Sequence, residues 1–287
     1  MAQVTLGIIQ QGCTADLAQN LRQTETAIRE AARRGAQVIC LQELYRSLYF
    51  AQTEAVENFS LAETVPGPSF KQMAQLAKEL GVVLIVPIFE KRMEGVYHNA
   101  VLVIDADGAV LGTYRKMHIP DDPGFYEKYY FAPGDLGFPV FKTRYGKIGV
   151  FICWDQWYPE AARLLALQGA QILFYPTAIG FSKSDQPVYQ RQREAWITIQ
   201  RAHAIANGVF VAAANRVGVE GQLHFWGSSF VSDPFGALLA QASDTQPDIL
   251  IQSCDLDLIE KTRQHWPFLR DRRIDAYQPI LARVIDA

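Results

Sequence analysis

The chain has 287 residues, 49% hydrophobic and 20% charged, so it can bury a sizeable core and does not have the composition of a disordered protein. Its 27 Lys and Arg against 30 Asp and Glu give a net charge of −3, which argues against a nucleic-acid binder that relies on bulk positive charge. No run approaches about eighteen apolar residues and no signal peptide is visible, so we expect a cytoplasmic protein with no membrane partner.

Strand-length apolar runs alternate with helical patterns along the chain, and turn residues separate them. In the first half, strands are predicted at 4–10, 36–42, 82–89, 97–104 and 110–116, and helices at 17–34 and 70–80. In the second half, strands are predicted at 147–153, 171–175, 209–214, 227–232, 238–240 and 249–255, and helices at 160–168 and 191–207. The turn sequences at 105–108 and 233–236 predict two hairpins.

These elements predict an α/β fold, because helices between fully apolar strands indicate sheets that are covered by helices. The two hairpins add antiparallel pairs, so we predict a four-layer α-β-β-α sandwich with mixed sheets. The chain has no Gly-, Ser- or Pro-rich linker and no repeat of roughly 20–50 residues. We therefore expect residues 1–287 to form a single domain.

The segment from about residue 263 onward combines aromatic residues such as Trp266, Phe268 and Tyr277 with many charges. A monomer seldom exposes an apolar patch of this kind. We therefore predict a homo-oligomer, at least a dimer, in which this C-terminal segment lies at a subunit interface.

The four cysteines lie at positions 13, 40, 153 and 254, too far apart for a CxxC metal knuckle or redox pair. Cys13, Cys40 and Cys254 are interpreted as buried core residues, because free cysteine is among the most buried residue types. Cys153 differs because it ends an apolar strand, as do Glu43 and Lys116.

Each of these three residues has an ordinary explanation on its own: a solvated loop glutamate, a surface lysine and a core cysteine. Together they favour catalysis, because ligands usually bind at strand ends in α/β sheets. A cysteine nucleophile needs a base for its proton and a cation for the developing oxyanion, and Glu43 and Lys116 supply both. There is no GxSxG motif. A Cys–His pair is also possible, but no local sequence motif selects one of the five histidines, which are His98, His118, His203, His224 and His265.

Three motifs resemble those of the nitrilase superfamily of carbon–nitrogen hydrolases. Residues 149–163, Gly-Val-Phe-Ile-Cys-Trp-Asp-Gln-Trp-Tyr-Pro-Glu-Ala-Ala-Arg, resemble its nucleophile motif. Residues 114–120, Tyr-Arg-Lys-Met-His-Ile-Pro, resemble its lysine motif, and residues 41–44, Leu-Gln-Glu-Leu, its glutamate motif. The order Glu, Lys, Cys is that of the superfamily, and the similarity extends from residue 4 to about residue 275.

The resemblance implies a role for each residue that matches a motif. Glu43 would be the general base, Cys153 the nucleophile and Lys116 the oxyanion donor, with the backbone N–H of Trp154 completing the oxyanion hole. Glu127 matches the second glutamate that many members place beside the lysine. The superfamily chemistry implies no metal and no organic cofactor.

Within the superfamily, residues 120–131, 153–159 and 175–180 are most similar to the N-carbamoylputrescine amidohydrolases. The implied substrate is a small carbamoyl amine, whose hydrolysis gives putrescine, carbon dioxide and ammonia. Its distal ammonium needs a carboxylate, and aromatic walls add cation–π attraction. The candidate substrate-binding residues are Tyr49, Asp121, Asp122, Tyr130, Trp154, Asp155, Thr177 and Phe181.

Other interpretations stay open at this point. Asp121 and Asp122 also suit a solvated turn before Pro123. Amine-binding relatives carry acidic residues soon after the segment that corresponds to 177–180, whereas this chain has Lys183 there. An amidase for an N-carbamoyl amino acid, such as N-carbamoyl-β-alanine, or for an ω-amide would need a donor for a carboxylate, with Arg191 and Arg193 as candidates. An aliphatic nitrilase and a catalytically inactive scaffold are further alternatives.

Overall fold

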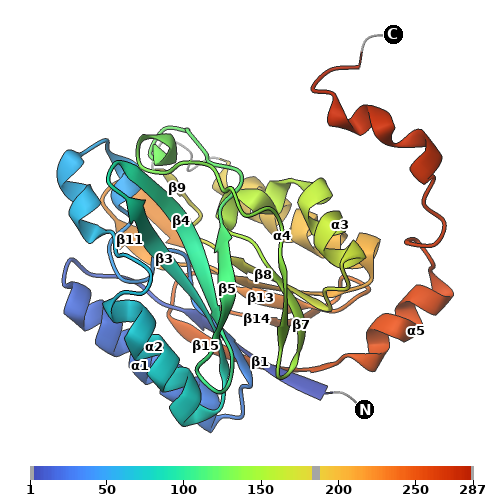
Figure 1. Cartoon of the computed structure of the whole chain (residues 1–287), viewed down its shortest axis with the longest axis horizontal. Coiled ribbons are helices and arrows are strands. Elements are labelled where there is room, and N and C mark those ends of the chain that lie inside the picture. The colour runs from blue at the N-terminus through green and yellow to red at the C-terminus, as the bar shows by residue number, and fades with distance from the viewer. Residues whose placement is uncertain (1–2, 183–187, 286–287) are drawn as a thin grey trace.

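The computed structural model describes residues 3–182 and 188–285, and two six-stranded sheets form its centre (Figure 1). The first sheet contains, in spatial order, β15 (Asp248–Asp255), β1 (Gln3–Gln10), β2 (Val38–Cys40), β3 (Val83–Met93), β4 (Val96–Ile104) and β5 (Val110–Arg115). The second contains β14 (Leu238–Gln241), β13 (Phe230–Ser232), β10 (Phe210–Ala214), β8 (Ile172–Pro176), β7 (Gly146–Val150) and β6 (Val140–Thr143).

Both sheets are mixed. Strands β1, β2 and β3 run parallel, and so do β7, β8 and β10, while the outer strands of each sheet pair antiparallel. Parallel neighbours need a crossover, which the helices supply. The carboxyl ends of β2 and β7 are therefore free to carry loops at one edge of the sandwich.

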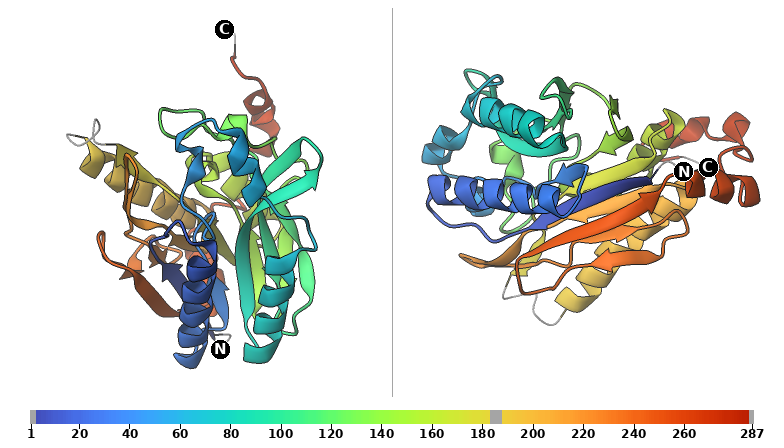
Figure 2. Two further views of the ribbon diagram at one scale, coloured as in Figure 1. Left: turned by 90° about the vertical axis from the view of Figure 1, so that its left-hand side faces the viewer. Right: turned by 90° about the horizontal axis from the view of Figure 1, so that it is seen from below.

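Helices cover the outer faces of the two sheets (Figure 2). Helices α1 (Leu17–Arg33) and α2 (Pro68–Leu80) pack on the first sheet, and α3 (Pro159–Leu167) and α4 (Tyr189–Asn207) on the second. The Asp16 side chain accepts hydrogen bonds from the first turn of α1, and Gly81 ends α2 in the left-handed region with φ 66°. The predicted four-layer α-β-β-α sandwich is confirmed.

The central strands are apolar along their whole length because they are buried on both faces. One core lies between the two sheets and contains, for example, Val38, Val103 and Val150; another lies between the first sheet and its helices. Cys40 and Cys254 are buried in the inner core, as predicted, whereas Cys13 is only half-buried and donates to the carbonyl of Tyr45 at 3.2 Å.

Short elements escaped the sequence prediction. Strands β9 (Gly180–Ser182), β11 (Val217–Glu220) and β12 (Leu223–Trp226) form a third, three-stranded sheet, and β6 completes an edge. Such strands contain three or four residues, too few for an alternating pattern to be recognised. The predicted strand at 36–42 is shortened to β2, and that at 147–153 to β7, because the chain leaves each sheet to form a turn.

Helix α5 (Asp257–His265) was also missed, and the chain after it extends away from the sandwich (Figure 1). Trp266, Phe268 and Tyr277 are exposed, as are Ile280 and Leu281. None of the helices within residues 3–182 and 188–285 combines the length and the apolar character needed to cross a bilayer.

Candidate active site

The side chains of Glu43, Lys116 and Glu127 meet in the interior of the protein. Glu43 follows β2, Lys116 follows β5, and Glu127 begins a 3-10 helix at Glu127–Tyr129. The Lys116 Nζ lies 2.9 Å from Glu43 Oε1 and 2.6 Å from Glu127 Oε2, and all three side chains are buried. The structure thus brings together three of the four residues for which the sequence predicted catalytic roles.

The Glu43 carboxylate is held by two further donors. The Asn99 Nδ2 donates to Oε1 at 2.7 Å, and the backbone N–H of Ala178 donates to Oε2 at 2.8 Å. With Lys116, both oxygens are therefore oriented by hydrogen bonds. Asn99 had no motif to identify it, because it lies within the apolar strand β4.

Cys153 lies beside this cluster, at the start of a 3-10 helix at Cys153–Trp157. Burial and the negative charge of Glu43 raise the pKa of the Cys153 thiol well above its ordinary value, and the opposing effect of Lys116 is smaller. The backbone N–H of Ala178 also lowers this pKa. The thiol is therefore protonated at neutral pH, and it needs a base when it attacks.

The same charges act on Lys116 and Glu127. Burial lowers the pKa of Lys116, but Glu127 and Glu43 outweigh it and hold that pKa above its ordinary value, so the ammonium stays charged. Burial raises the pKa of Glu127, against the attraction of Lys116. The site therefore keeps one fixed cation between two carboxyl groups.

The turn that presents Cys153 is strained. Cys153 has φ 44°, in the left-handed region that residues with a Cβ seldom adopt. Asp155 holds this turn from inside: its carboxylate accepts from the N–H of Ile152 at 2.9 Å and from the Tyr114 hydroxyl at 2.7 Å. It also accepts from the backbone N–H of His118 at 3.0 Å, and its Oδ1 lies 2.7 Å from His118 Nδ1.

A pocket of about 550 Å³ opens above Cys153 and is of a size that suits a small-molecule substrate. Its lining residues are Pro120, Asp122, Pro123, Phe125, Cys153, Trp154, Trp157, Ile179, Gly180, Ser182, Gln192, Ala195 and Trp226. Asp122 is its acidic side chain. Among the lining residues that the structure describes there is no Lys, Arg or His.

Of the predicted substrate-binding residues, Asp122 and Trp154 line this pocket. Asp121 is exposed and does not line it. Phe181 lies one residue beyond Gly180 and lines a neighbouring pocket with Tyr189 instead, with ring centroids 4.3 Å apart.

The other four candidate substrate-binding residues do not line this pocket, and each is engaged within the fold. Asp155 is fully buried, and its two oxygens are taken by the contacts described above. The Tyr49 hydroxyl donates to Glu127 Oε1 at 2.8 Å, and the Tyr130 hydroxyl donates to the Thr53 carbonyl. Thr177 is buried and donates to the carbonyl of Tyr175 at 3.0 Å. These side chains support the site from within the fold.

The alternative donors for a substrate carboxylate do not reach the pocket. Arg191 is exposed on α4, and Arg193 pairs with Asp244 at 2.7 Å. Lys183 lies outside the described residues. Sequence reasoning missed most of the pocket wall, including Phe125, Trp157 and Trp226, because the lining residues come from five separate segments and belong to no single pattern.

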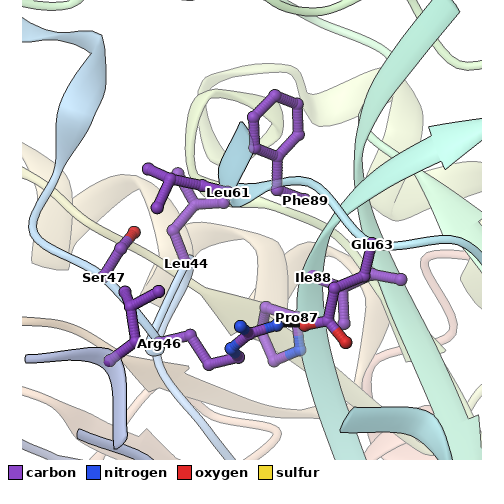
Figure 3. A pocket seen from close by; sticks show the side chains of 9 residues that line it. Leu44, Arg46, Ser47, Leu61, Glu63, Pro87, Ile88 and Phe89 are labelled. Carbon is purple, nitrogen blue, oxygen red and sulfur yellow. Dashed lines mark ion pairs between the residues drawn. The ribbon is translucent and has the colours of Figure 1, made fainter. Parts of the chain in front are cut away.

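A second, small pocket lies near Leu44, on the segment that follows Glu43 (Figure 3). Its volume is about 20 Å³, and Arg46 and Glu63 form an ion pair along its edge. It has room for about one water molecule, so it is no substrate site. Within residues 3–182 and 188–285, no three His, Cys, Asp or Glu side chains are grouped so as to hold a metal ion.

Comparisons with known proteins identify the family. Residues 5–264 match the family model described as carbon-nitrogen hydrolase. The N-carbamoylputrescine amidase of Solanum lycopersicum is 47% identical over 287 residues, which cover 97% of this chain and 95% of that protein. The citrullinase of Francisella tularensis subsp. tularensis is 41% identical, over 99% of this chain and 100% of that protein.

Among solved structures, the carbon-nitrogen hydrolase from Helicobacter pylori G27 has a TM-score of 0.95 and 47% sequence identity. The match covers 99% of this chain and 100% of that one. The resemblance first indicated by the three motifs is thereby confirmed, and this protein belongs to the carbon–nitrogen hydrolase family.

Proposed function

We propose that this protein hydrolyses N-carbamoylputrescine to putrescine, carbon dioxide and ammonia. The observation that carries the proposal is the pocket above Cys153, which offers the carboxylate of Asp122 and, among its described lining residues, no cationic side chain. A substrate that ends in an ammonium fits this charge distribution, because the solvent-exposed carboxylate of Asp122 attracts a cation. Relatives named N-carbamoylputrescine amidase are 44% to 47% identical to the chain.

The same pocket argues against a substrate that carries a carboxylate. Citrulline differs from N-carbamoylputrescine by a carboxylate on the carbon that carries its α-amino group, and N-carbamoyl-β-alanine and glutaramate also carry one. A buried carboxylate is usually held by arginine or by several N–H donors. Asp122 would repel it. Citrulline hydrolysis is the second candidate, because a citrullinase is 41% identical to this chain over nearly its whole length.

The first chemical step uses the cluster around Lys116. The Cys153 sulfur attacks the carbamoyl carbon, and its proton passes to Glu43, which is required because the resting thiol is neutral. The carbonyl oxygen gains the negative charge between Lys116 and the N–H of Trp154. Glu43 then gives its proton to the leaving nitrogen, so that the C–N bond breaks and a carbamoyl thioester remains.

The second step is hydrolysis of this thioester. Water attacks the same carbon, Glu43 again takes a proton, and the Cys153 thiol is regenerated. The carbamic acid that is released breaks down to carbon dioxide and ammonia. Glu127 accepts from Lys116 and is itself held by the Tyr49 hydroxyl, so the ammonium stays in place while charge develops on the substrate.

A release assay tests the proposal. N-carbamoylputrescine, citrulline, N-carbamoyl-β-alanine and glutaramate are offered separately, and ammonia is measured over a range of concentrations. We expect the highest kcat/KM for N-carbamoylputrescine. A higher value for citrulline would move the assignment to the second candidate, and no release from any of the four would support the inactive scaffold.

The charge of the pocket is tested by a matched pair of variants. Asp122→Asn should raise KM for N-carbamoylputrescine about tenfold, the equivalent of about 1.4 kcal/mol, because the distal ammonium loses its counter-ion. Asp121→Asn removes the same charge one residue away, outside the pocket, and should leave KM unchanged. Equal effects of the two substitutions would contradict a direct contact with Asp122.

We further propose that the protein is at least a dimer and acts in the cytoplasm. The exposed apolar side chains of the C-terminal segment begin at Trp266, just beyond the family match, and they support a subunit contact. The four cysteines are free, as is usual in a reducing compartment. Light scattering that gives a single 32.2 kDa species at micromolar concentration would contradict the dimer.

A further inference from the structure

Arg216 is a fully buried arginine that lies outside the pocket and outside the proposed chemistry. It directly precedes β11, in the small third sheet, and its side chain has 0% exposure. A buried guanidinium is costly unless acceptors surround it. The positions of its hydrogen-bond acceptors indicate the role of Arg216.

Three of these acceptors are carbonyl oxygens of the segment 43–47. The Arg216 Nη2 donates to the carbonyls of Glu43 at 3.1 Å and Leu44 at 2.8 Å, and Nη1 donates to the carbonyl of Ser47 at 3.0 Å. The Nη1 also pairs with Glu220 Oε1 at 2.7 Å. One side chain therefore fixes the backbone on which Glu43 is carried.

The two carbonyls held by Nη2 lie on either side of the Cα atom of Leu44. Leu44 has φ 50°, a left-handed conformation that a leucine resists because its Cβ crowds the backbone. The orientation of the two flanking peptide groups sets this conformation. Arg216 therefore holds in place the turn at Leu44, which directly follows Glu43.

Glu220 holds the far end of the same segment. Its Oε2 accepts from the backbone N–H of Tyr49 at 2.6 Å, and the Tyr49 hydroxyl donates to Glu127 at 2.8 Å. The segment 43–49 thus begins with Glu43 and ends with Tyr49, whose hydroxyl bonds to Glu127. Both ends are tied to the Arg216–Glu220 ion pair.

We propose that Arg216 and Glu220 are positioning residues for the reaction: together they keep the segment 43–49 in the strained form that presents Glu43 to Cys153 and Lys116. The inference rests on the proposed role of Glu43 as the base. The Arg216–Glu220 ion pair would then differ from a purely structural salt bridge. Its loss should lower turnover through a change in the turn at Leu44, while the pocket wall stays in place.

A double-mutant cycle tests this link. Arg216→Lys keeps the positive charge but cannot reach all four acceptors, so kcat should fall about tenfold while KM stays within about threefold. Glycine adopts φ 50° without steric cost. In the Leu44→Gly background the same Arg216→Lys change should therefore lower kcat by only about threefold or less.

The control is a leucine of equal burial in an ordinary conformation. Leu44 and Leu76 are both 3% exposed, and Leu76 lies in α2, on the outer face of the first sheet. In the Leu76→Gly background, Arg216→Lys should keep its full effect of about tenfold. Equal effects in all three backgrounds, or a folded Arg216→Lys variant with the kcat of the wild type, would overturn the proposal.

A second measurement needs no substrate. Hydrogen exchange followed by mass spectrometry should show faster exchange of peptides covering 43–49 in Glu220→Gln and Arg216→Lys, and unchanged exchange there in Leu76→Gly. Unchanged exchange in the first two variants would also overturn the proposal. The cycle uses whichever of the four assay substrates the wild type hydrolyses, so a wrong substrate assignment is seen in the wild type alone and does not affect this test.

Discussion

Two turns of this protein hold a strained backbone conformation by different means. The Cys153 turn and the turn at Leu44 each place a residue with a side chain in the left-handed region, at φ 44° and φ 50°. Such residues cost about 1–3 kcal/mol and persist only where the surroundings hold them. At each turn a buried charged side chain accepts from, or donates to, the local backbone.

The source of that side chain differs. Asp155 stands two residues after Cys153, so the nucleophile motif carries its own support. Arg216 comes from a distant part of the chain, and the Leu44 turn is complete only after the third sheet has packed against it. The support of the Cys153 turn thus lies within its own motif, although Tyr114 and His118 also bond to Asp155, whereas the support of the Leu44 turn comes from a distant segment.

Removing the nucleophile while keeping its turn should have the largest effect. Cys153→Ala leaves Asp155 and its hydrogen bonds in place, so the pocket should still bind N-carbamoylputrescine. Turnover should fall about 10⁴-fold or more, because no other thiol lines the described pocket. Isothermal titration and the ammonia assay give the two values, and appreciable turnover after this change would refute the role of Cys153.

Lys116→Ala removes the cation that bonds to Glu43 and lowers the pKa of Cys153. It should cost about 3 kcal/mol or more in transition-state stabilisation, the size of one lost oxyanion donor. Because Lys116 lowers the pKa of Cys153, its removal should raise that pKa further. Steady-state kinetics measure the first effect, and a pH titration of thiolate absorbance, corrected with Cys153→Ala, measures the second.

Glu43→Gln tests the carboxylate separately from its turn, since the carbonyls that Arg216 holds are unchanged. Turnover should fall about 10²-fold or more because the base is lost. The pKa of Cys153 should move the opposite way from Lys116→Ala: Glu43 raises it, so removing the negative charge lowers it and thiolate forms at a lower pH. Near-wild-type turnover, or a raised thiol pKa, would contradict this account.

The smallest effect is expected for the local support. In Asp155→Asn, one carboxylate oxygen is replaced by an NH₂ group, which cannot accept the hydrogen bonds that the Tyr114 hydroxyl and the Ile152 N–H donate. The free energy of unfolding should therefore fall by about 1–3 kcal/mol. The turnover of the folded enzyme should fall about tenfold, as for Arg216→Lys. Urea denaturation and the ammonia assay compare the two turns directly, with Asp121→Asn as the exposed control.

Much of the fold and part of the site were predicted from local patterns. The long strands and helices have the right apolar periodicity, and Glu43, Lys116 and Cys153 stand at the ends of strands. Of the candidate substrate-binding residues, Asp122 and Trp154 line the described pocket. Tyr49, Tyr130, Asp155 and Thr177 have suitable chemistry and motif positions, but they face inward and bond to neighbours in the fold.

The sequence by itself determined the order of elements, the three motifs and the residue types needed for thiol chemistry, because these depend on local backbone preference and burial. Tertiary structure alone decided which distant side chains meet. Asn99 reaches Glu43 because β4 pairs with β3 in one particular register, with Asn99 opposite Phe89. Arg216 and Trp226 reach the site only when the third sheet packs against the rest of the fold. Contacts between segments far apart in the chain produce no periodic pattern in the sequence of either segment.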